Sequence, residues 1–117
     1  MFTVTLRMKV SRKRRQDFMN SARLILGPTK IQSGCISCRL YQDLDEPDAV
    51  FLVEEWESRE KLDRHFSSEQ CRIMLSLMEA SDQFPEIKIN TVSKMEGLEA
   101  IEAVRRGPEI GYARPGY

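Results

Sequence analysis

The chain has 117 residues, of which 41% are hydrophobic, and its 18 basic side chains are balanced by 18 acidic ones. This length suits a single globular domain, and the charge balance excludes a general attraction to nucleic acid or to a membrane surface. The longest apolar run, 49–53, is far shorter than the roughly 20 residues of a membrane helix. No apolar leader follows Met1, so we expect a cytoplasmic protein with reduced cysteines.

The first half of the chain predicts a strand, a helix and a hairpin. Residues 2–10 alternate between apolar and polar side chains, which is typical of a strand with one buried face. Ser11 is the predicted N-cap of a helix over 12–26, a Gly-Pro pair at 27–28 kinks or breaks this helix, and Ser33-Gly34 ends the element. Two further predicted strands flank a turn rich in Asp and Pro and form an antiparallel hairpin: 35–42 and 49–57.

The second half predicts three helices and one more strand. Ser58 caps a short helix that has Leu62 and Phe66 on its buried side. The remaining elements are a helix from the capping box at 67–70 to about Phe84, a strand over 86–92, and a helix from the capping box at 93–96 to about Arg106. The tail at 109–117 predicts no regular structure.

This order of elements predicts an α+β fold of the ferredoxin-like type, β-α-β-β-α-β, with a four-stranded antiparallel sheet and an extra C-terminal helix. The domain would span 1–93, and 94–117 would pack on the same or on a partner subunit. Helices cover only one face of such a sheet, yet the third strand has apolar residues on both faces: Leu52 and Trp56 on one, Phe51 and Val53 on the other. An uncovered apolar face implies a partner, so we expect a homodimer that pairs the open sheet faces.

A C-x-x-C pair, Cys35 and Cys38, would suggest zinc or redox chemistry. Residues three apart on a strand point to opposite faces, so we expect that the two thiols cannot share one ion. Only Cys71 and His65 could complete a zinc site of four ligands, and a predicted helix break separates them. A redox pair would have to begin a helix, whereas this pair begins a strand. We therefore expect small buried thiols and no metal site.

Two blocks of charge stand out in the sequence. Residues 7–15 hold six basic and no acidic side chains, and 43–63 hold nine acidic ones. The basic block could bind nucleic acid or an anionic ligand, or the two blocks could pair within a subunit or across a dimer. No aromatic residues interleave the basic block and the whole chain is neutral, so we expect pairing and no binding of nucleic acid.

A few polar and aromatic side chains are candidate site residues. Histidine is the side-chain type best suited to exchange protons in a neutral cell, and His65 stands at the edge of an apolar stripe, so it is either a boundary residue or an acid or base in a pocket. Trp56 is either core or dimer packing or a pocket wall. Arg39 and Tyr41 share a strand face, and they either bind an oxygen-rich aromatic ligand or line the dimer surface. No phosphate-binding loop or dinucleotide fingerprint is present, so no cofactor is predicted.

Several short features occur together in the chain: a Gly-Cys entry to the second strand, Arg39-Leu-Tyr41, an Asp/Pro turn, Glu54-Glu-Trp-Glu-Ser58 and, one helix later, His65-Phe66. With these features, residues 2–93 resemble antibiotic biosynthesis monooxygenase (ABM) domains. The resemblance implies a dimeric α+β barrel with a buried cavity between sheet and helices. The predicted helix that ends near Arg106 extends past the usual end of the family.

Some members of this family oxygenate phenols or quinols without metal or flavin. For this chain the resemblance implies His65 as the base, and it implies four substrate-binding residues: Trp56, Tyr41 and Phe66 around the ring and Arg39 as a donor to the substrate anion. Related haem-degrading members use a haem-ligating His, which would fall near Leu75. The chain has no second His, so haem degradation is not expected.

Three functions are consistent with the sequence. The leading expectation is a cofactor-independent monooxygenase that oxidises a small phenol or quinol with O₂. The alternatives are a non-catalytic dimeric domain that binds a small apolar molecule, and an isomerase-type activity in which His65 moves a proton of a small carbonyl compound. Oxygen uptake, binding without turnover, and proton exchange without oxygen use distinguish the three.

Overall fold

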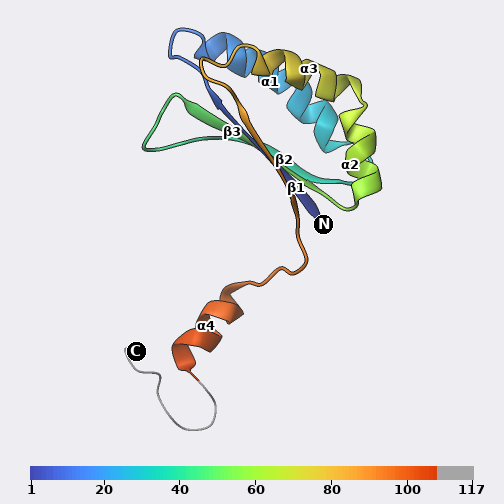
Figure 1. The fold of residues 1–117 in the computed structure, drawn as a ribbon, viewed down its shortest axis with the longest axis vertical. Helices are drawn as coiled ribbons and strands as arrows, with labels where there is room; N and C mark the ends of the chain where they lie inside the picture. Colours follow the sequence, from blue (N-terminus) through green and yellow to red (C-terminus); the bar gives the residue numbers. More distant parts are fainter. Residues whose placement is uncertain (108–117) are drawn as a thin grey trace.

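The computed structural model of the chain describes residues 1–107, and the tail at 109–117, which predicts no regular structure, lies outside the described residues. The elements within 1–107 are shown in Figure 1: β1 (Phe2–Lys9), α1 (Arg15–Lys30), β2 (Cys35–Gln42), β3 (Ala49–Trp56), α2 (Arg59–Phe66), α3 (Glu69–Met78), β4 (Glu86–Thr91) and α4 (Leu98–Arg106). The strands match their predicted ranges to within one residue.

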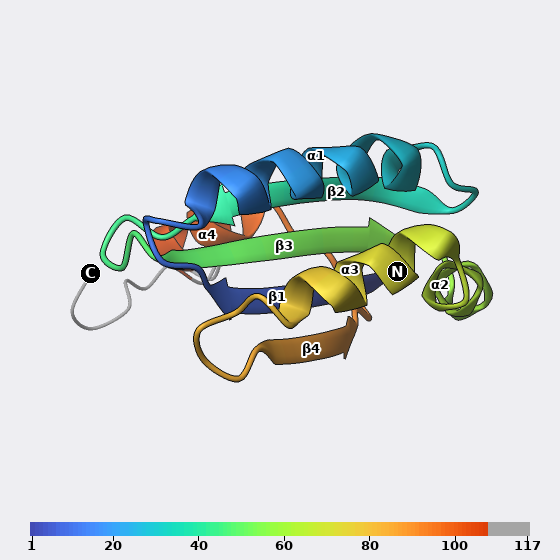
Figure 2. The same ribbon diagram turned by 90° about the horizontal axis from the view of Figure 1, so that it is seen from above.

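The four strands form one antiparallel sheet in the order β2-β3-β1-β4. α1 and α3 lie side by side over one face of this sheet, and α2 lies at its end on the same side (Figures 1 and 2). This is the ferredoxin-like β-α-β-β-α-β arrangement with an added helix. The predicted fold class is therefore confirmed.

The core lies between the sheet and the two long helices. The alternation of β1 turns Val4, Leu6 and Met8 toward the helices, where none of them is more than 3% exposed. The side chains that cover them come from α1 and α3: Phe18, Ala22, Ile25, Cys71 and Met74. Because burying one large apolar side chain contributes about 1.5–3 kcal/mol, this face of the sheet fixes the position of the helix layer.

The start of α1 differs from the prediction, because Ser11 is not its N-cap. The helix begins at Arg15 with Arg14 as N-cap, and no side chain caps it. Ser11 lies in the preceding turn, where its carbonyl accepts from the Arg14 N–H at 3.0 Å and its own N–H donates to Asp82 Oδ2 at 2.8 Å. Asp82 also accepts a hydrogen bond from the Arg14 guanidinium at 2.9 Å. This distant aspartate holds the turn, and the helix starts after it.

α1 is not broken at Gly27 and Pro28 and continues to Lys30, shortly before Ser33 and Gly34, where the element was predicted to end. Proline lacks the N–H that would bond the carbonyl four residues earlier, which here belongs to Leu24. Leu24 is 72% exposed, so water has access to this part of the helix and the lost bond costs little.

α3 begins and ends at other residues than predicted. Its N-cap is Ser68, whose hydroxyl accepts the Cys71 N–H, and the helix stops at Met78, well before Phe84. The residues after Met78 bond the end of β1 instead: Ser81 Oγ accepts the Lys9 N–H at 3.1 Å, and the Asp82 N–H donates to the Lys9 carbonyl at 2.7 Å. These bonds to the sheet replace the bonds of a longer helix.

A β-bulge changes the placement of two cysteines. The register shifts between Cys35 and Ser37, so that Cys35 pairs with Trp56 and Cys38 pairs with Glu54. Trp56 and Glu54 are both buried on the helix side of the sheet. Since paired residues share a face, both thiols point to the helix side, and the prediction that they point to opposite faces is wrong.

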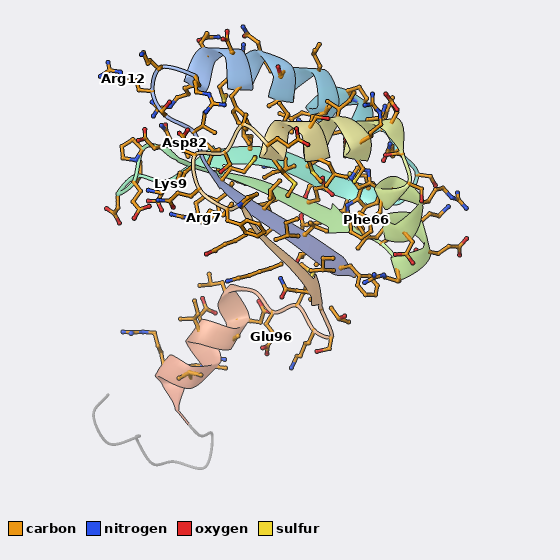
Figure 3. The ribbon with its side chains drawn as sticks, turned by 45° about the horizontal axis from the view of Figure 1, so that its top comes forward. Arg7, Lys9, Arg12, Phe66, Asp82 and Glu96 are labelled. Atoms are coloured by element: carbon orange, nitrogen blue, oxygen red, sulfur yellow. The ribbon has the colours of Figure 1, made fainter. Side chains whose placement is uncertain are left out.

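The basic and acidic blocks pair within the chain. This is one of the two predicted arrangements, and the other was pairing across a dimer. Arg7 and Lys9 contact Glu46 at 2.7 and 3.0 Å, and Arg15 contacts Asp48 at 2.8 Å. The hydrogen bond from Lys9 lowers the pKa of the Glu46 carboxyl. These pairs connect the turn between β2 and β3 to β1 and α1, at the end of the sheet where Figure 3 shows Arg7, Lys9 and Asp82.

α4 lies apart from the folded body, on the side of the sheet opposite to α1 and α3 (Figure 1). It begins at Leu98 after Gly97, not at the predicted capping box 93–96. Leu98, Ile101 and Val104 form an apolar stripe that is 43–66% exposed in the single chain. The packing of this helix on a partner subunit stays a prediction. Within residues 1–107, no helix has the length and hydropathy needed to cross a membrane.

Candidate functional site

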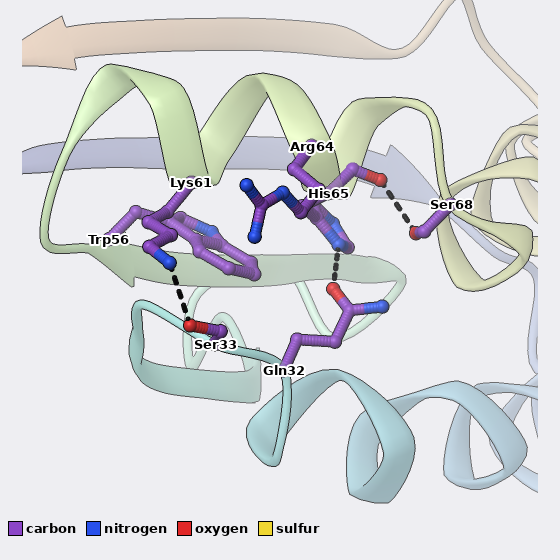
Figure 4. Close-up of a pocket in the computed structure, with 7 residues that line it drawn as sticks. All are labelled: Gln32, Ser33, Trp56, Lys61, Arg64, His65 and Ser68. Carbon is purple, nitrogen blue, oxygen red and sulfur yellow. Dashed lines mark hydrogen bonds between the residues drawn. The ribbon is translucent and has the colours of Figure 1, made fainter.

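A pocket of about 160 Å³ lies where α2 meets the turn between α1 and β2 (Figure 4). Ser58 fixes the start of α2, because its hydroxyl accepts the Lys61 N–H at 3.2 Å. The pocket lining comes from four parts of the chain: Gln32 and Ser33 from the turn, Trp56 from the end of β3, Lys61, Arg64 and His65 from α2, and Ser68 from the cap of α3.

Gly34 allows the turn to approach α2 closely. Its φ of 88° lies in the region that favours glycine, and a Cβ at this position would collide with the side chain of Lys61. The Gly34 carbonyl accepts the Glu57 N–H at 2.8 Å, which ties the turn to the end of β3. Gln32 and Ser33 are thereby held against α2, and Lys61 Nζ donates to Ser33 Oγ at 2.9 Å.

His65 is buried against the indole of Trp56. The two rings are stacked with their centroids 4.6 Å apart and their planes 25° from parallel. His65 is 2% exposed and Trp56 is 0% exposed, so the sequence interpretation of His65 as a boundary residue that could reach solvent is replaced by a buried position. Stacking of this kind orients the imidazole and contributes about 0.5–1.5 kcal/mol.

The tautomer of His65 follows from its neighbours. Gln32 Nε2 donates to Gln70 Oε1 at 2.7 Å, so the other end of the Gln32 amide, Oε1, faces His65 Nδ1 at 2.6 Å. An amide oxygen only accepts hydrogen bonds, and therefore Nδ1 carries the hydrogen. In the neutral ring, Nε2 then has a free lone pair.

The second ring nitrogen of His65 is buried without a hydrogen bond. Nε2 lies 3.3 Å from Glu54 Oε1, but no hydrogen bond joins them, and within residues 1–107 Nε2 has no other partner. Glu54 is itself only 2% exposed, and the same Oε1 accepts the indole N–H of Trp56 at 3.0 Å. A buried polar atom without a partner costs about 1–3 kcal/mol. His65 thus lines the pocket, and its buried Nε2 has a carboxylate next to it and no hydrogen-bond partner among residues 1–107.

Comparison with known proteins gives the family. Residues 1–74 match the family model described as antibiotic biosynthesis monooxygenase, ABM, which is more than half of the chain. The chain belongs to the ABM family. An uncharacterised Synechocystis protein is 30% identical to it over 61 residues, which are 52% of this chain and 42% of that relative. The match therefore spans less than half of the length of this curated relative.

Solved structures share the fold of this ABM chain. A conserved protein from Methanosarcina mazei is 31% identical, with a TM-score of 0.71 over 76% of this chain and 89% of the other. A structure described as antibiotic biosynthesis monooxygenase has a TM-score of 0.71 at 19% identity, over 80% of this chain and 100% of the other. At that identity the second likeness shows the fold alone.

The structure brings together some of the predicted site residues of this ABM chain and separates others. Trp56 and His65 are in contact, and Phe66 follows on the same helix with its ring centroid 6.2 Å from that of His65. Arg39 and Tyr41 pair with Val53 and Phe51 on the open face of the sheet, away from the helices. The site around His65 and the pair on the open face therefore lie on opposite sides of the sheet.

Phe66 opens onto a second hollow of about 240 Å³ between α3 and the β1–β4 side of the sheet. Its lining is entirely apolar apart from one thiol: Val4, Leu6, Phe66, Cys71, Met74, Leu75, Ile87 and Ile89. Figure 3 shows Phe66 at the end of the sheet opposite to Asp82. This hollow offers contact area to a ligand, and its one ionisable lining group is the Cys71 thiol, whose pKa is raised by burial.

Two residues that matter most for the geometry were not predicted. Glu54 stands between Leu52 and Trp56 on the same strand face, and a carboxylate at an alternating position between two buried apolar residues was the signal for its burial. Gln32 gave no such signal, because it reaches His65 across 33 residues of sequence. Lys61 and Arg64 line the pocket from the same helix as His65.

The thiols near the site have raised pKa values, which makes them weak nucleophiles. Burial, with the charge of Glu54 as the second cause, raises the pKa of Cys38 to about 12 and also raises the pKa values of Cys35 and Cys71. All three therefore carry their protons at neutral pH. No group of three His, Cys, Asp or Glu side chains within residues 1–107 is placed to hold a metal ion.

Proposed function

We propose that this ABM chain is a monooxygenase that oxidises a small phenol or quinol with O₂ and uses no cofactor. The observation that supports the proposal is His65, which lines the pocket and whose buried Nε2 has no hydrogen-bond partner among residues 1–107. A phenolic hydroxyl would satisfy this acceptor and would be placed for proton transfer. Trp56 would stack on the aromatic ring or close the pocket beside it.

The reaction needs only a base and a dry pocket. His65 Nε2 takes the phenolic proton, and the electron-rich phenolate transfers two electrons to O₂ as a ring carbon that bears hydrogen forms a C–O bond. The C–H and O–O bonds of the resulting peroxide then break, which leaves a quinone and hydroxide. The hydroxide takes the proton back from His65, so that one phenol and one O₂ give one quinone and one water.

Glu54 and Gln32 stabilise the protonated form of His65 during this cycle. Gln32 Oε1 continues to accept from Nδ1 at 2.6 Å, and the Glu54 carboxylate lies 3.3 Å from Nε2, where positive charge appears. The carboxylate attracts the positive charge that forms on the ring as the phenol gives up its proton. Glu54 is a positioning residue, since it contacts His65 and Trp56 and does not line the pocket that would hold the substrate.

Oxygen consumption tests the proposal. Purified metal-free protein is assayed against small phenols and quinols, with His65→Ala alongside and with Arg59→Gln, which lies on the outer side of the same helix, as the control. Saturable uptake above the spontaneous rate that is lost only in His65→Ala is the expected result. Full turnover in His65→Ala would exclude this residue as the base. Binding without uptake would favour a ligand-binding domain, and proton exchange without uptake would favour an isomerase.

We propose in addition that the chain acts as a cytoplasmic homodimer that pairs the open faces of two sheets. This face carries Phe51, Val53 and Tyr41, and Tyr41 is 50% exposed in the single chain. An apolar patch on an open sheet face is typical of an interface. Light scattering should give the mass of two chains, and Val53→Asp should give a folded monomer. A monomeric parent protein would contradict the proposal.

A further inference from the structure

We propose that the pocket at His65 selects an aromatic ligand that carries a negative charge, such as a hydroxy-substituted aromatic carboxylate. This inference rests on the proposed function for the role of His65, and it adds a second recognition element, a pair of cations formed by Lys61 and Arg64. Both residues line the same pocket as Trp56 and His65 (Figure 4).

Lys61 is the less compensated of the two cations. Its Nζ donates to Ser33 Oγ at 2.9 Å, and within residues 1–107 no carboxylate lies close enough to form an ion pair with it. Its half-buried stem packs against the turn at Gly34, which limits where the ammonium can go. An ammonium held in this way retains donors for a carboxylate oxygen.

Arg64 supplies the second charge. Its only ion pair among the described residues is with Glu60, at 3.5 Å, and both side chains are more than 60% exposed. Such a pair is weak and can be exchanged for a better acceptor. The guanidinium can bind a carboxylate through two parallel hydrogen bonds, which a neutral ligand group cannot offer.

The acids near the pocket do not cancel this charge. Asp63, on the same helix, is paired with Arg59 at 2.8 Å. Glu54 is buried behind Trp56 and is held by the indole N–H at 3.0 Å. The pocket itself is lined by two cations and no carboxylate. This arrangement favours an anion on the side of Lys61 and Arg64 and a phenolic hydroxyl on the side of His65.

The size of the pocket limits the ligand to about one ring. A cavity of about 150 Å³ is sufficient for benzene, and this pocket has about 160 Å³. A ring in contact with Trp56, one hydroxyl and one carboxylate therefore account for the lining: aromatic surface, one buried acceptor and two cations. The chemical class is a monocyclic hydroxyaryl acid.

Calorimetric titration tests the inference without requiring turnover. The probes are 4-hydroxybenzoate and 4-hydroxybenzamide, which have nearly the same shape and differ in charge. We expect the acid to bind at least about tenfold more tightly than the amide at low salt, since hydrogen bonds to charged groups are the stronger ones. This ratio should fall at high salt. The protein has a single tryptophan, so its one indole N–H signal in NMR reports whether the ligand is in this pocket.

Matched variants of α2 show which side chains cause the acid to bind more tightly than the amide. Lys61→Gln should weaken binding of the acid about tenfold and leave binding of the amide within about twofold, and Arg64→Gln should act in the same direction. Arg59→Gln removes a cation of the same helix that does not line the pocket, and it should change neither affinity. Circular dichroism of each variant verifies the fold.

Several results would overturn the inference: equal affinity for acid and amide, no binding of either probe, or equal losses for both probes in Lys61→Gln. The proposed function can fail independently. If the acid binds with the expected charge preference but causes no oxygen uptake, the anion site stands and the monooxygenase proposal falls. If neutral quinols are oxidised while the acid does not bind, the monooxygenase proposal stands and the anion site falls.

Discussion

Trp56 donates its indole N–H to Glu54 Oε1 at 3.0 Å, and neither side chain is more than 2% exposed. Each partner satisfies a group that would otherwise be buried without a hydrogen bond. Trp56→Phe should therefore lower the free energy of unfolding by about 1–3 kcal/mol beyond the loss of packing. Glu54→Leu should be similarly costly, and the double variant should cost less than the sum, as measured by urea denaturation. If the two losses of unfolding free energy simply add in the double variant, this would contradict a direct bond between Trp56 and Glu54.

Glu54 should also affect the rate of the proposed reaction. Glu54→Gln keeps the shape of the side chain and removes the charge that lies 3.3 Å from His65 Nε2. We expect kcat/KM to fall by roughly tenfold or more, because the imidazolium that forms when the phenol gives up its proton loses the negative charge next to it. Glu55→Gln is the matched control, since Glu55 points to the open face and bonds Ser37. An unchanged kcat/KM in Glu54→Gln would exclude the electrostatic role.

Gly34 and Gly27 should respond in opposite ways to alanine. Gly34 has a φ of 88° and its added methyl group would meet Lys61, so Gly34→Ala should destabilise the protein by about 1–3 kcal/mol and disturb the pocket. Gly27 is helical and has open space around it, so Gly27→Ala should stabilise by about 0.5–1 kcal/mol. Thermal and urea unfolding give both values. A neutral Gly34→Ala would show that the turn is not constrained as described.

The raised pKa of the Cys38 thiol predicts that the protein loses stability at alkaline pH. Burial and the charge of Glu54 raise the pKa of its thiol to about 12, above the ordinary value of 9.0. A raised pKa in the folded state means that the folded chain holds this proton more tightly than the unfolded chain does. The stability that results from this difference is fully present below pH 9 and is lost as the pH rises toward 12. The difference in unfolding free energy between the parent protein and Cys38→Ala should narrow over this range. If the difference in unfolding free energy between the two proteins does not vary with pH, the pKa of the Cys38 thiol is not raised.

Local sequence patterns were sufficient for the sheet and insufficient for the helix ends. The alternation over 2–10 and the hairpin around the Asp/Pro turn depend on neighbouring residues only, and the strands formed where they were predicted. Ser11 failed as a cap because Asp82, 71 residues later, bonds its N–H. A contact over that separation leaves no local trace, and the same loop explains why α3 ends at Met78.

The candidate site was predicted in part for the same reason. Trp56 and His65 were named as candidates, and the fold places them in contact. Arg39 and Tyr41 were grouped with them, but the strand alternation puts this pair on the open face, where their roles stay predictions. The bulge between Cys35 and Ser37 depends on how β2 pairs with β3, which the spacing of the cysteines does not determine. Gln32 and Glu54 acquire their importance only through His65.

The most direct test of the account is nitrogen NMR of the single histidine. In the free protein we predict that hydrogen is on Nδ1, which faces Gln32 Oε1, and not on Nε2. When a hydroxyaryl acid is added without oxygen and binds, Nε2 should become protonated. At the same time the ultraviolet spectrum of the ligand should change to that of its phenolate. A histidine whose nitrogen shifts do not change on binding, or one with hydrogen on Nε2 and none on Nδ1 in the free protein, would contradict the assignment of His65 as the base.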